Sequence, residues 1–558
     1  MDIFNSPKFR SRVEQLMIQN HVPGLSIAIV QNETIASAGY GKASLDPSKP
    51  CTADTIIGSI LPSLQYSTVQ FISFPPRPTD RSVEVTYAYC YITHLAHFSR
   101  TLLALLTLAR RSWTLFDIAS ASKSLTAGAV GLLVDDDKKY PEVQYEATMS
   151  SLLPEDFVMC EGYTENVTVE DILSHRTGMA SHDSSYLGPR ATKPDDPQSV
   201  TRNLRNLAVC APLRSKYHYC NMMFTVATYL VEKKSGQSFP DFLEEHFFQP
   251  LDMNSTNLQP QRARDKGLDE RIATGYAWNE DNKAYHGFQA PDCPEAQGAG
   301  SIITSVNDYI KWVKAIMNHE APITKDIYDG LVKPRAFHST SFENLRPLTS
   351  LTSIGAGWEV CFYRGYMVVS HDGSVPGFGS RHFFLPDFKF GGAIFGNSGG
   401  AGIVAAIVAQ ELIDEVLKVP ETERPDWSKI ESELGDDGGE EEEAEPQQHI
   451  YPGTKWSQPQ ERPLSAYTGE YSNPGYHDLT VQIKDDKLFV DAMDRSFGFT
   501  LVFDHVREQI KYIARLCDHL DEGDEPLRAE FVFKGDKAVR MGLHLEIELE
   551  ELIWFDRV

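Results

Sequence analysis

The hydrophobic pattern of the chain predicts different secondary structures in different regions. Residues 6–21 carry apolar side chains at helical spacing, which predicts a helix. Pro23-Gly24 follows it as a stop signal. Short apolar runs at 25–30 and 34–41, separated by Gln-Asn-Glu, predict a β-hairpin. Further strands are predicted at 366–370, 382–385 and 392–395, and a helix at 405–418. Because strands lie near both ends of the first 420 residues and helices lie between them, the predicted class is α+β rather than a doubly wound fold.

The C-terminal part of the chain changes character twice. Residues 426–462 predict a linker, first acidic and then rich in Pro and Gln. Residues 463–558 contain short alternating segments, which predict a small β-sheet or barrel domain.

Residues 56–114 differ from the rest, because these 59 residues contain no lysine. The apolar run at 101–109 is far shorter than the roughly 20 residues needed to span a bilayer. A buried hairpin, a lid, or sequence foreign to the folded protein would each fit this composition.

Composition and charge exclude several classes of function. The chain has 558 residues and a net charge of -26, which argues against nucleic-acid binding. Nine acids in residues 431–445 supply about a third of that excess, as expected of a solvated tether. The eight cysteines form no C-x-x-C pair and no zinc spacing, so we expect neither a metal nor another cofactor. The N-terminus lacks the apolar run of a secretory signal, which predicts a cytoplasmic protein without membrane association.

The segment Asp117–Gly128 (DIASASKSLTAG) contains a serine three residues before a lysine. Ser120 could simply cap the helix predicted to follow it. Alternatively, residues three apart share a helix face, so Lys123 can reach the Ser120 hydroxyl and act as a base when desolvated. Backbone N–H groups at a helix start can also stabilise an oxyanion. Ser122 and Ser124 lack this spacing to the lysine.

Two further motifs favour catalysis. Tyr219-x-Asn221 follows about 100 residues later, and His371-Asp-Gly373-Ser374 follows after another 150. With these motifs the chain resembles the serine β-lactamase and penicillin-binding-protein superfamily, in its class C β-lactamase, D-aminopeptidase and esterase branch. The segments VPGLSIAIV, VTVEDILSHRTGM and GAGSIITSVNDY strengthen the likeness, although Arg176 departs from the usual LLxHTSG spelling.

The resemblance implies a β-lactamase/transpeptidase-like fold, an antiparallel sheet flanked by helices plus a helical subdomain. It implies that Ser120 is acylated and that Lys123 and Tyr219 share the proton transfers, in an order that the sequence leaves open. Asn221 would orient Lys123 and the substrate. The backbone N–H groups of Ser120 and Ser374 would form the oxyanion hole, beside Gly373. His371 replaces a lysine that binds carboxylates in the antibiotic-binding relatives, which makes ester or amide hydrolysis the expected reaction.

The resemblance also implies a domain organisation. The catalytic domain would comprise 1–55 and 115–425, and 463–558 would be a lipocalin-like module. In the family, the sequence signature that contains Asp54 continues directly into the part that contains Leu115, but here residues 56–114 interrupt it. These residues are therefore predicted to be an insertion, either translated intron sequence or a disordered or lid segment.

The predicted function is hydrolysis of an amide or ester through an acyl-enzyme, with a small molecule or short peptide as substrate and an open oligomeric state. Two alternatives use the same fold: acyl transfer in secondary metabolism, and a non-catalytic assembly role. A third places the nucleophile at Ser398, because Gly396–Gly400 (GNSGG) matches the G-x-S-x-G elbow of α/β-hydrolases.

Overall fold

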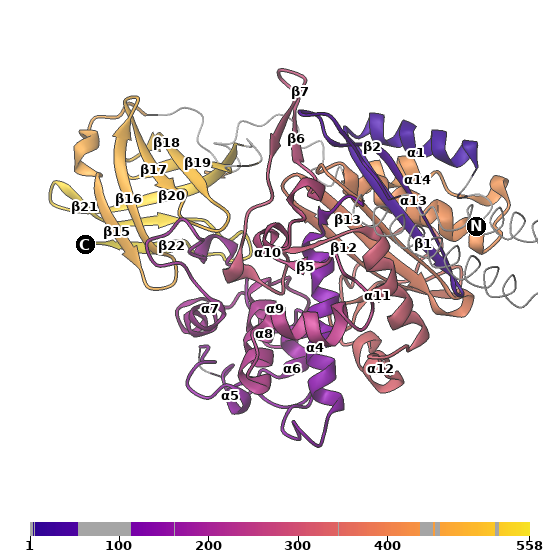
Figure 1. Ribbon diagram of the computed structural model, residues 1–558. Coiled ribbons are helices and arrows are strands. Elements are labelled where there is room, and N and C mark those ends of the chain that lie inside the picture. The colour runs from indigo at the N-terminus through magenta and orange to yellow at the C-terminus, as the bar shows by residue number, and fades with distance from the viewer. Residues whose placement is uncertain are drawn as a thin grey trace, which may run out of the picture.

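The structure is a computed structural model in which a helix-covered sheet lies beside a β-barrel (Figure 1). It describes residue 4 and residues 6–53, 113–160, 162–343, 345–435, 450–451, 458–518, 520 and 524–558. In the described residues, no helix is both long and apolar enough to cross a membrane.

Nine antiparallel strands form the main sheet, in the order β3-β2-β1-β14-β13-β12-β11-β10-β9. The predicted hairpin is confirmed, because β1 and β2 pair directly. On β1, Ile27 and Ile29 enter one hydrophobic core while Ala28 and Val30 enter the other, so the strand is covered on both faces. The strands are β1 (Gly24–Gln31), β2 (Thr34–Ser44), β3 (Lys49–Pro50), β9 (Ala336–Phe337), β10 (Ser353–Ile354), β11 (Glu359–Tyr363), β12 (Tyr366–Val375), β13 (Phe378–Leu385) and β14 (Phe390–Gly396).

Helices cover both faces of this sheet (Figure 1). On one face lie α1 (Pro7–Gln19), α13 (Ala401–Val416) and α14 (Trp427–Gly435). The opposite face packs against α11 (Val306–Asn318), beside which lies α12 (Lys325–Val332). Helix α1 begins where Ser6 Oγ accepts a hydrogen bond from the Phe9 N–H at 3.2 Å and Pro7 fixes the first turn.

The helical region continues below the sheet in Figure 1 and includes the two helices that carry the predicted motifs. Helix α4 (Lys123–Asp135) is buried on almost every side and packs against α8 (Met222–Ser235). A small sheet of β4 (Phe116–Asp117), β8 (Ile302–Thr304) and β5 (Asn257–Leu258) leads into α4. The remaining elements here are α5 (Met149–Leu152), α6 (Val169–Leu173), α7 (Pro197–Asn203), α9 (Phe239–Leu243), α10 (Pro260–Asp265), β6 (Gly275–Asn279) and β7 (Ala284–Phe288).

The C-terminal residues form a closed eight-stranded barrel, as the alternating pattern predicts. Inward-facing aromatic rings, among them Tyr467, Tyr512 and Phe531, pack edge-to-face in its core. The strands are β15 (Gly469–Asn473), β16 (His477–Lys484), β17 (Lys487–Ala492), β18 (Phe499–Arg507), β19 (Lys511–Asp518), β20 (Glu525–Lys534), β21 (Lys537–Leu543) and β22 (Ile553–Arg557).

The start of the predicted linker is part of the folded protein. Trp427 of α14 donates its indole N–H to Asp414 of α13 at 2.8 Å, and Glu431 pairs with Arg346 at 2.7 Å. Tyr451 is buried against the barrel and donates to the Ala529 carbonyl at 2.9 Å. The acidic and Pro/Gln-rich composition of 426–462 therefore does not show where the packed structure ends.

Most of the predicted insertion lies outside the described residues. Thr114, at its C-terminal end, is hydrogen-bonded to Thr52, which precedes the insertion. The Thr114 N–H donates to the Thr52 carbonyl at 2.9 Å, and the Thr52 N–H donates to Thr114 Oγ1 at 2.9 Å. Trp113 and Thr114 are buried in the fold, so these two residues belong to the packed structure.

Candidate active site

Ser120 lies in a tight turn between β4 and α4. A 3-10 turn over Ala119–Ser122 precedes the helix, and Ser120 makes no capping contact. The capping interpretation is therefore wrong, because the Ser120 hydroxyl faces Lys123 and Tyr219 instead. Ala119 has φ of +47°, a left-handed conformation that costs a non-glycine residue roughly 1–2 kcal/mol. Asp117 Oδ1 supports it by accepting the Ala119 N–H at 2.8 Å.

Lys123 is fully buried beneath Ser120 and has three oxygen partners. Its Nζ lies 3.0 Å from Ser120 Oγ, 2.8 Å from Asn221 Oδ1 and 2.8 Å from the Ala299 carbonyl oxygen. Burial lowers the pKa of Lys123 to about 7, against the opposing attraction of Asp183. A substantial fraction of the lysine is therefore neutral at physiological pH.

Tyr219 and Asn221 come from the segment immediately before α8. Tyr219 Oη donates to Ser120 Oγ at 2.6 Å, and burial raises the pKa of this phenol. The Asn221 amide donates to both Asp183 oxygens, at 3.0 and 3.3 Å, which turns its carbonyl toward Lys123. Burial raises the pKa of Asp183 to about 7. The structure thus brings the first two predicted motifs together.

Strand β12 brings the third motif beside the Ser120 turn. A Cβ on Gly373 would lie 2.1 Å from the Ile118 carbonyl oxygen, so only glycine permits this close approach. The motif lies within β12 rather than after it, with Ser374 paired to Gly379 of β13. His371 Nδ1 donates to the Asp372 carbonyl at 2.6 Å, and burial lowers the pKa of His371 to about 4. The imidazole is therefore neutral at pH 7.

A cavity of about 590 Å³ opens onto Ser120, a size typical of small-molecule sites. Ser120, Asp183, Asn221 and Ser374 line it, whereas Lys123, Tyr219 and His371 lie outside its lining. The barrel supplies part of the wall through residues 495–498, in the connection between β17 and β18. Ser398 lies outside this lining, in the buried turn that joins β14 to α13. The local strand–turn–helix order matches an α/β-hydrolase elbow, but the strand belongs to an antiparallel sheet rather than a doubly wound one.

The barrel connection is attached to the catalytic region by backbone hydrogen bonds. The Ser496 N–H donates to the Tyr186 carbonyl at 3.1 Å, and the Gly188 N–H donates to the Asp494 carbonyl at 2.9 Å. Arg495 is buried and donates to the Tyr476 and Asp478 carbonyls at 2.8 and 3.1 Å. These contacts hold one wall of the cavity at a fixed distance from Ser120.

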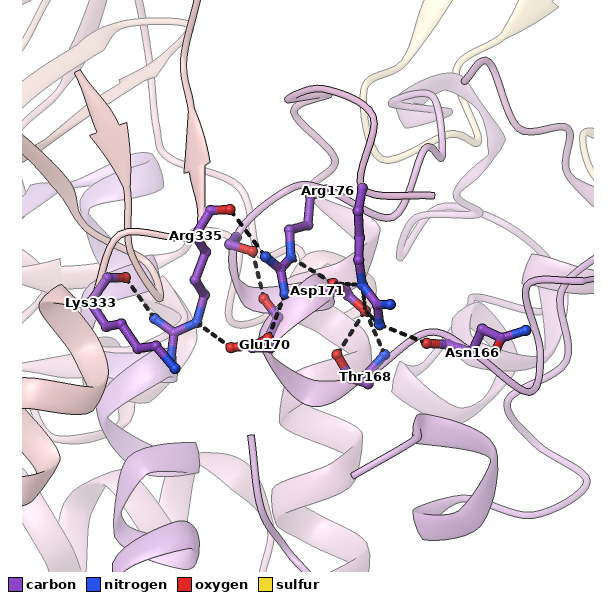
Figure 2. A network of polar contacts seen from close by, with 9 residues as sticks. Asn166, Thr168, Glu170, Asp171, Arg176, Lys333 and Arg335 are labelled. Atoms are coloured by element: carbon purple, nitrogen blue, oxygen red, sulfur yellow. Dashed lines mark hydrogen bonds and ion pairs between the residues drawn. The ribbon is translucent and has the colours of Figure 1, made fainter. Parts of the chain in front are cut away.

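An ionic network explains the unusual Arg176 beside the predicted site (Figure 2). Arg176 Nε donates to the fully buried Asp171 carboxylate at 2.6 Å, and Arg214 donates to the same carboxylate at 2.6 Å. Asp171 also accepts the Thr168 N–H at 2.9 Å. The next residue back along the chain from Arg176 is His175, whose ring stacks on Tyr219 at a centroid distance of 4.4 Å. The network therefore supports the loop that backs Tyr219.

Several residues of the site escape sequence reasoning. Asp183 and His175 have no catalytic spacing, and Ala299 contributes only a backbone carbonyl. Residues 495–498 come from a different part of the fold altogether. The GAGS segment around Ala299 and the histidine of ILSHRTG carried a family signal but no assigned role.

Comparisons with known proteins agree with this geometry. Residues 110–413 match the family described as Beta-lactamase. The chain belongs to this beta-lactamase family. It is a serine-type hydrolase with a β-lactamase-like catalytic fold. Residues 454–557 match a domain of unknown function, DUF3471.

Two relatives of the chain are proteins from Aspergillus species. The chain is 28% identical over 557 residues to Unguisins hydrolase ungD' of Aspergillus campestris, covering 98% of this chain and 91% of that protein. It is 32% identical over 421 residues to Unguisins hydrolase ungD of Aspergillus violaceofuscus, covering 70% and 73%. It is 27% identical to a D-aminopeptidase of Brucella anthropi over 41% of this chain and 40% of that protein.

A solved structure extends the likeness across both parts of the chain. The octameric penicillin-binding protein homologue from Pyrococcus abyssi superposes with a TM-score of 0.55 at 18% identity, covering 98% of this chain and 99% of that one. At this identity the match shows a shared fold.

Proposed function

We propose that the protein hydrolyses a peptide amide bond through an acyl-enzyme on Ser120, with Lys123 as the base that activates the serine. The observation that carries this proposal is the set of partners around Lys123 Nζ. Two of its three neighbours, Asn221 Oδ1 and the Ala299 carbonyl, can only accept hydrogen bonds. A neutral lysine uses its two N–H groups on them and turns its lone pair to the Ser120 hydroxyl.

Tyr219 takes the complementary role. Because burial keeps its phenol protonated, Tyr219 donates to Ser120 Oγ in the resting state and leaves Lys123 as the group able to accept a proton. As the C–N bond breaks, Tyr219 can relay the proton from Lys123 to the departing amine. This division assigns the roles that the sequence leaves open.

The reaction proceeds in two balanced steps. Ser120 Oγ bonds to the substrate carbonyl carbon while its proton moves to Lys123, and the C–N bond then breaks as that proton reaches the leaving nitrogen. Water next attacks the acyl ester, gives a proton to the same base and releases the acid with Ser120 restored. The N–H groups of Ser120 and Ser374 would hold the oxyanion in both steps, which the close packing of Gly373 on the Ser120 turn supports.

The substrate class follows from the cavity and the relatives. A cavity of about 590 Å³ holds a short section of a peptide rather than a folded protein. Neutral His371 offers no cation for a substrate carboxylate, which disfavours β-lactam antibiotics. Relatives named unguisins hydrolase and D-aminopeptidase support a peptide or D-amino-acid amide, with unguisins as the first substrates to test.

A substrate panel tests the proposal. Purified protein is assayed by mass spectrometry with unguisins, D-amino-acid amides, short-chain esters and a chromogenic cephalosporin. We expect hydrolysis of a peptide amide, little reaction with the cephalosporin, and loss of all turnover in Ser120→Ala but not in Ser398→Ala. Turnover that survives in Ser120→Ala would contradict the proposal. Transfer of the acyl group to an added alcohol in preference to water would favour the acyltransferase alternative.

A further inference from the structure

Cys210, His218 and Glu548 form a cluster between the catalytic region and the barrel. Cys210 and His218 come from the connection that leads into α8 and Glu548 comes from the barrel, and their candidate ligand atoms all lie within 4.8 Å of one another. Glu548 belongs to the connection between β21 and β22, whereas His218 directly precedes Tyr219. None of the three is among the residues that line the Ser120 cavity.

The distances in this cluster suit a tetrahedral metal ion. Cys210 Sγ lies 3.4 Å from His218 Nδ1, which lies 2.9 Å from Glu548 Oε1, and Cys210 Sγ lies 4.0 Å from Glu548 Oε2. Ligand atoms around tetrahedral zinc are about 3.3–3.6 Å apart, given bonds of about 2.0–2.3 Å. The two distances to Glu548 involve different oxygens, so the carboxylate would have to turn until one oxygen meets both partners, from a starting arrangement in which the ligand atoms all lie within 4.8 Å of one another.

Hydrogen bonds cannot join all three side chains through His218 at once, although the Cys210 thiol can donate to the Gly178 carbonyl at 3.4 Å instead. A neutral imidazole nitrogen can donate to Glu548 or accept from the Cys210 thiol, but it cannot do both at once. A cation would bind the nitrogen lone pair, the sulfur and the carboxylate together. Two anionic ligands and a neutral imidazole also balance a divalent charge, which favours such an ion in a partly buried site.

We propose that Cys210, His218 and Glu548 bind a zinc ion that joins the barrel to the segment carrying Tyr219. The thiolate selects zinc over magnesium or calcium, and Glu548 leaves the site open to solvent for a fourth water ligand. Sequence spacing hides the site, because 8 positions separate Cys210 from His218 and 330 separate His218 from Glu548.

The connection between β21 and β22, which carries Glu548, also contacts the catalytic region through a neighbouring set of side chains. Glu546 accepts from Tyr476 Oη at 2.9 Å, and His182 Nδ1 lies 2.6 Å from that oxygen. His182 directly precedes Asp183, just as His218 directly precedes Tyr219. The zinc ion would thus add a second attachment beside an existing one, and its loss would loosen the barrel rather than remove a reacting group.

Cobalt substitution tests the zinc site without relying on activity. The full-length protein is treated with a chelator, dialysed and titrated with Co²⁺ while thiolate-to-cobalt charge transfer is followed in the near ultraviolet. We expect about one ion per chain and displacement by Zn²⁺. Cys210→Ser should abolish the band, and Glu548→Gln should weaken binding at least about tenfold.

Matched controls separate this site from adventitious binding. Cys517→Ser and Glu551→Gln alter an exposed thiol and an exposed carboxylate of the barrel, and both should bind Co²⁺ like the unmodified chain. If Cys210→Ser fails to fold, alkylation of Cys210 in the unmodified chain gives a second measurement. Zn²⁺ should slow it at least about tenfold in the unmodified chain but not in Glu548→Gln. Absence of the charge-transfer band, or a band unchanged by Cys210→Ser, overturns the proposal, as does alkylation that Zn²⁺ leaves unchanged.

Discussion

The two walls of the Ser120 cavity differ in what their polar groups do. On the side of the catalytic fold, Lys123 and Tyr219 lie behind the lining, and with Asn221 of the lining they direct their polar atoms at Ser120 or at one another. On the barrel wall, Arg495 and the backbone of Ser496 direct theirs at neighbouring carbonyls and so hold the connection in place. The side of the catalytic fold can transfer protons, so its residues should control kcat. The barrel wall only shapes the cavity, so its residues should control KM.

The largest effect is expected from removing the base. Lys123→Met keeps the apolar stem but loses the amine, so kcat should fall by a factor on the order of 10²–10⁴. Steady-state hydrolysis of an activated ester measures this change. The exposed Lys216→Met serves as a control and should stay within about twofold. A Lys123 variant that retains more than a tenth of the activity would contradict the role of Lys123 as the base.

Removing the Tyr219 hydroxyl should cost less. Tyr219→Phe loses the donor to Ser120 and the relay to the leaving group, so kcat on an amide should fall about 100-fold. Its neighbour provides a matched control, because Tyr217→Phe removes a phenol that also lies against His175. Equal losses in the two variants would show that packing, rather than proton transfer, explains the effect.

The pH profile should report the lysine on the side of the catalytic fold. Catalysis needs neutral Lys123, so kcat/KM should rise with pH through a midpoint near 7 and level off above it. The Asp183 charge raises the pKa of Lys123, so Asp183→Asn should move this midpoint to lower pH. An unchanged or higher midpoint in Asp183→Asn would show that a different group titrates.

A smaller effect is expected on the barrel wall. Phe497→Ala enlarges the cavity without touching a reacting group, so KM should rise up to about tenfold while kcat changes less than about twofold. Phe489→Ala, on a barrel strand outside the cavity lining, should leave both constants unchanged. A fall in kcat alone for Phe497→Ala would place chemistry on the barrel wall.

The smallest effect is expected from deleting residues 56–112. Thr52 and Thr114 are hydrogen-bonded, and the joined chain would leave residues 53, 54, 55 and 113 between them, a length common in hairpin loops. The described lining residues of both walls are retained, so the shortened protein should keep kcat and KM within about threefold. Circular dichroism and the ester assay measure this result, and a shortened protein that fails to fold would show that the segment is required.

Sequence reasoning predicted the parts of the fold that repeat a local pattern. The β1–β2 hairpin, α13 and the barrel strands follow from apolar periodicity, and the segments that carry the three motifs lie around the Ser120 turn. Local sequence alone could not separate a capping Ser120 from a serine in a 3-10 turn, so the two later motifs were needed to favour catalysis. Asp183 and residues 495–498 could not be predicted, since their contacts depend on long-range packing.

The central claim is that Ser120, activated by Lys123, forms the acyl-enzyme. The most direct test mixes the protein with a slowly hydrolysed ester, quenches it in acid and locates the acyl group by peptide mass spectrometry. The account predicts one acyl group on the peptide containing Ser120, its absence in Ser120→Ala, and strongly reduced formation in Lys123→Met. An acyl group on Ser398, or unchanged acylation in Lys123→Met, would contradict it.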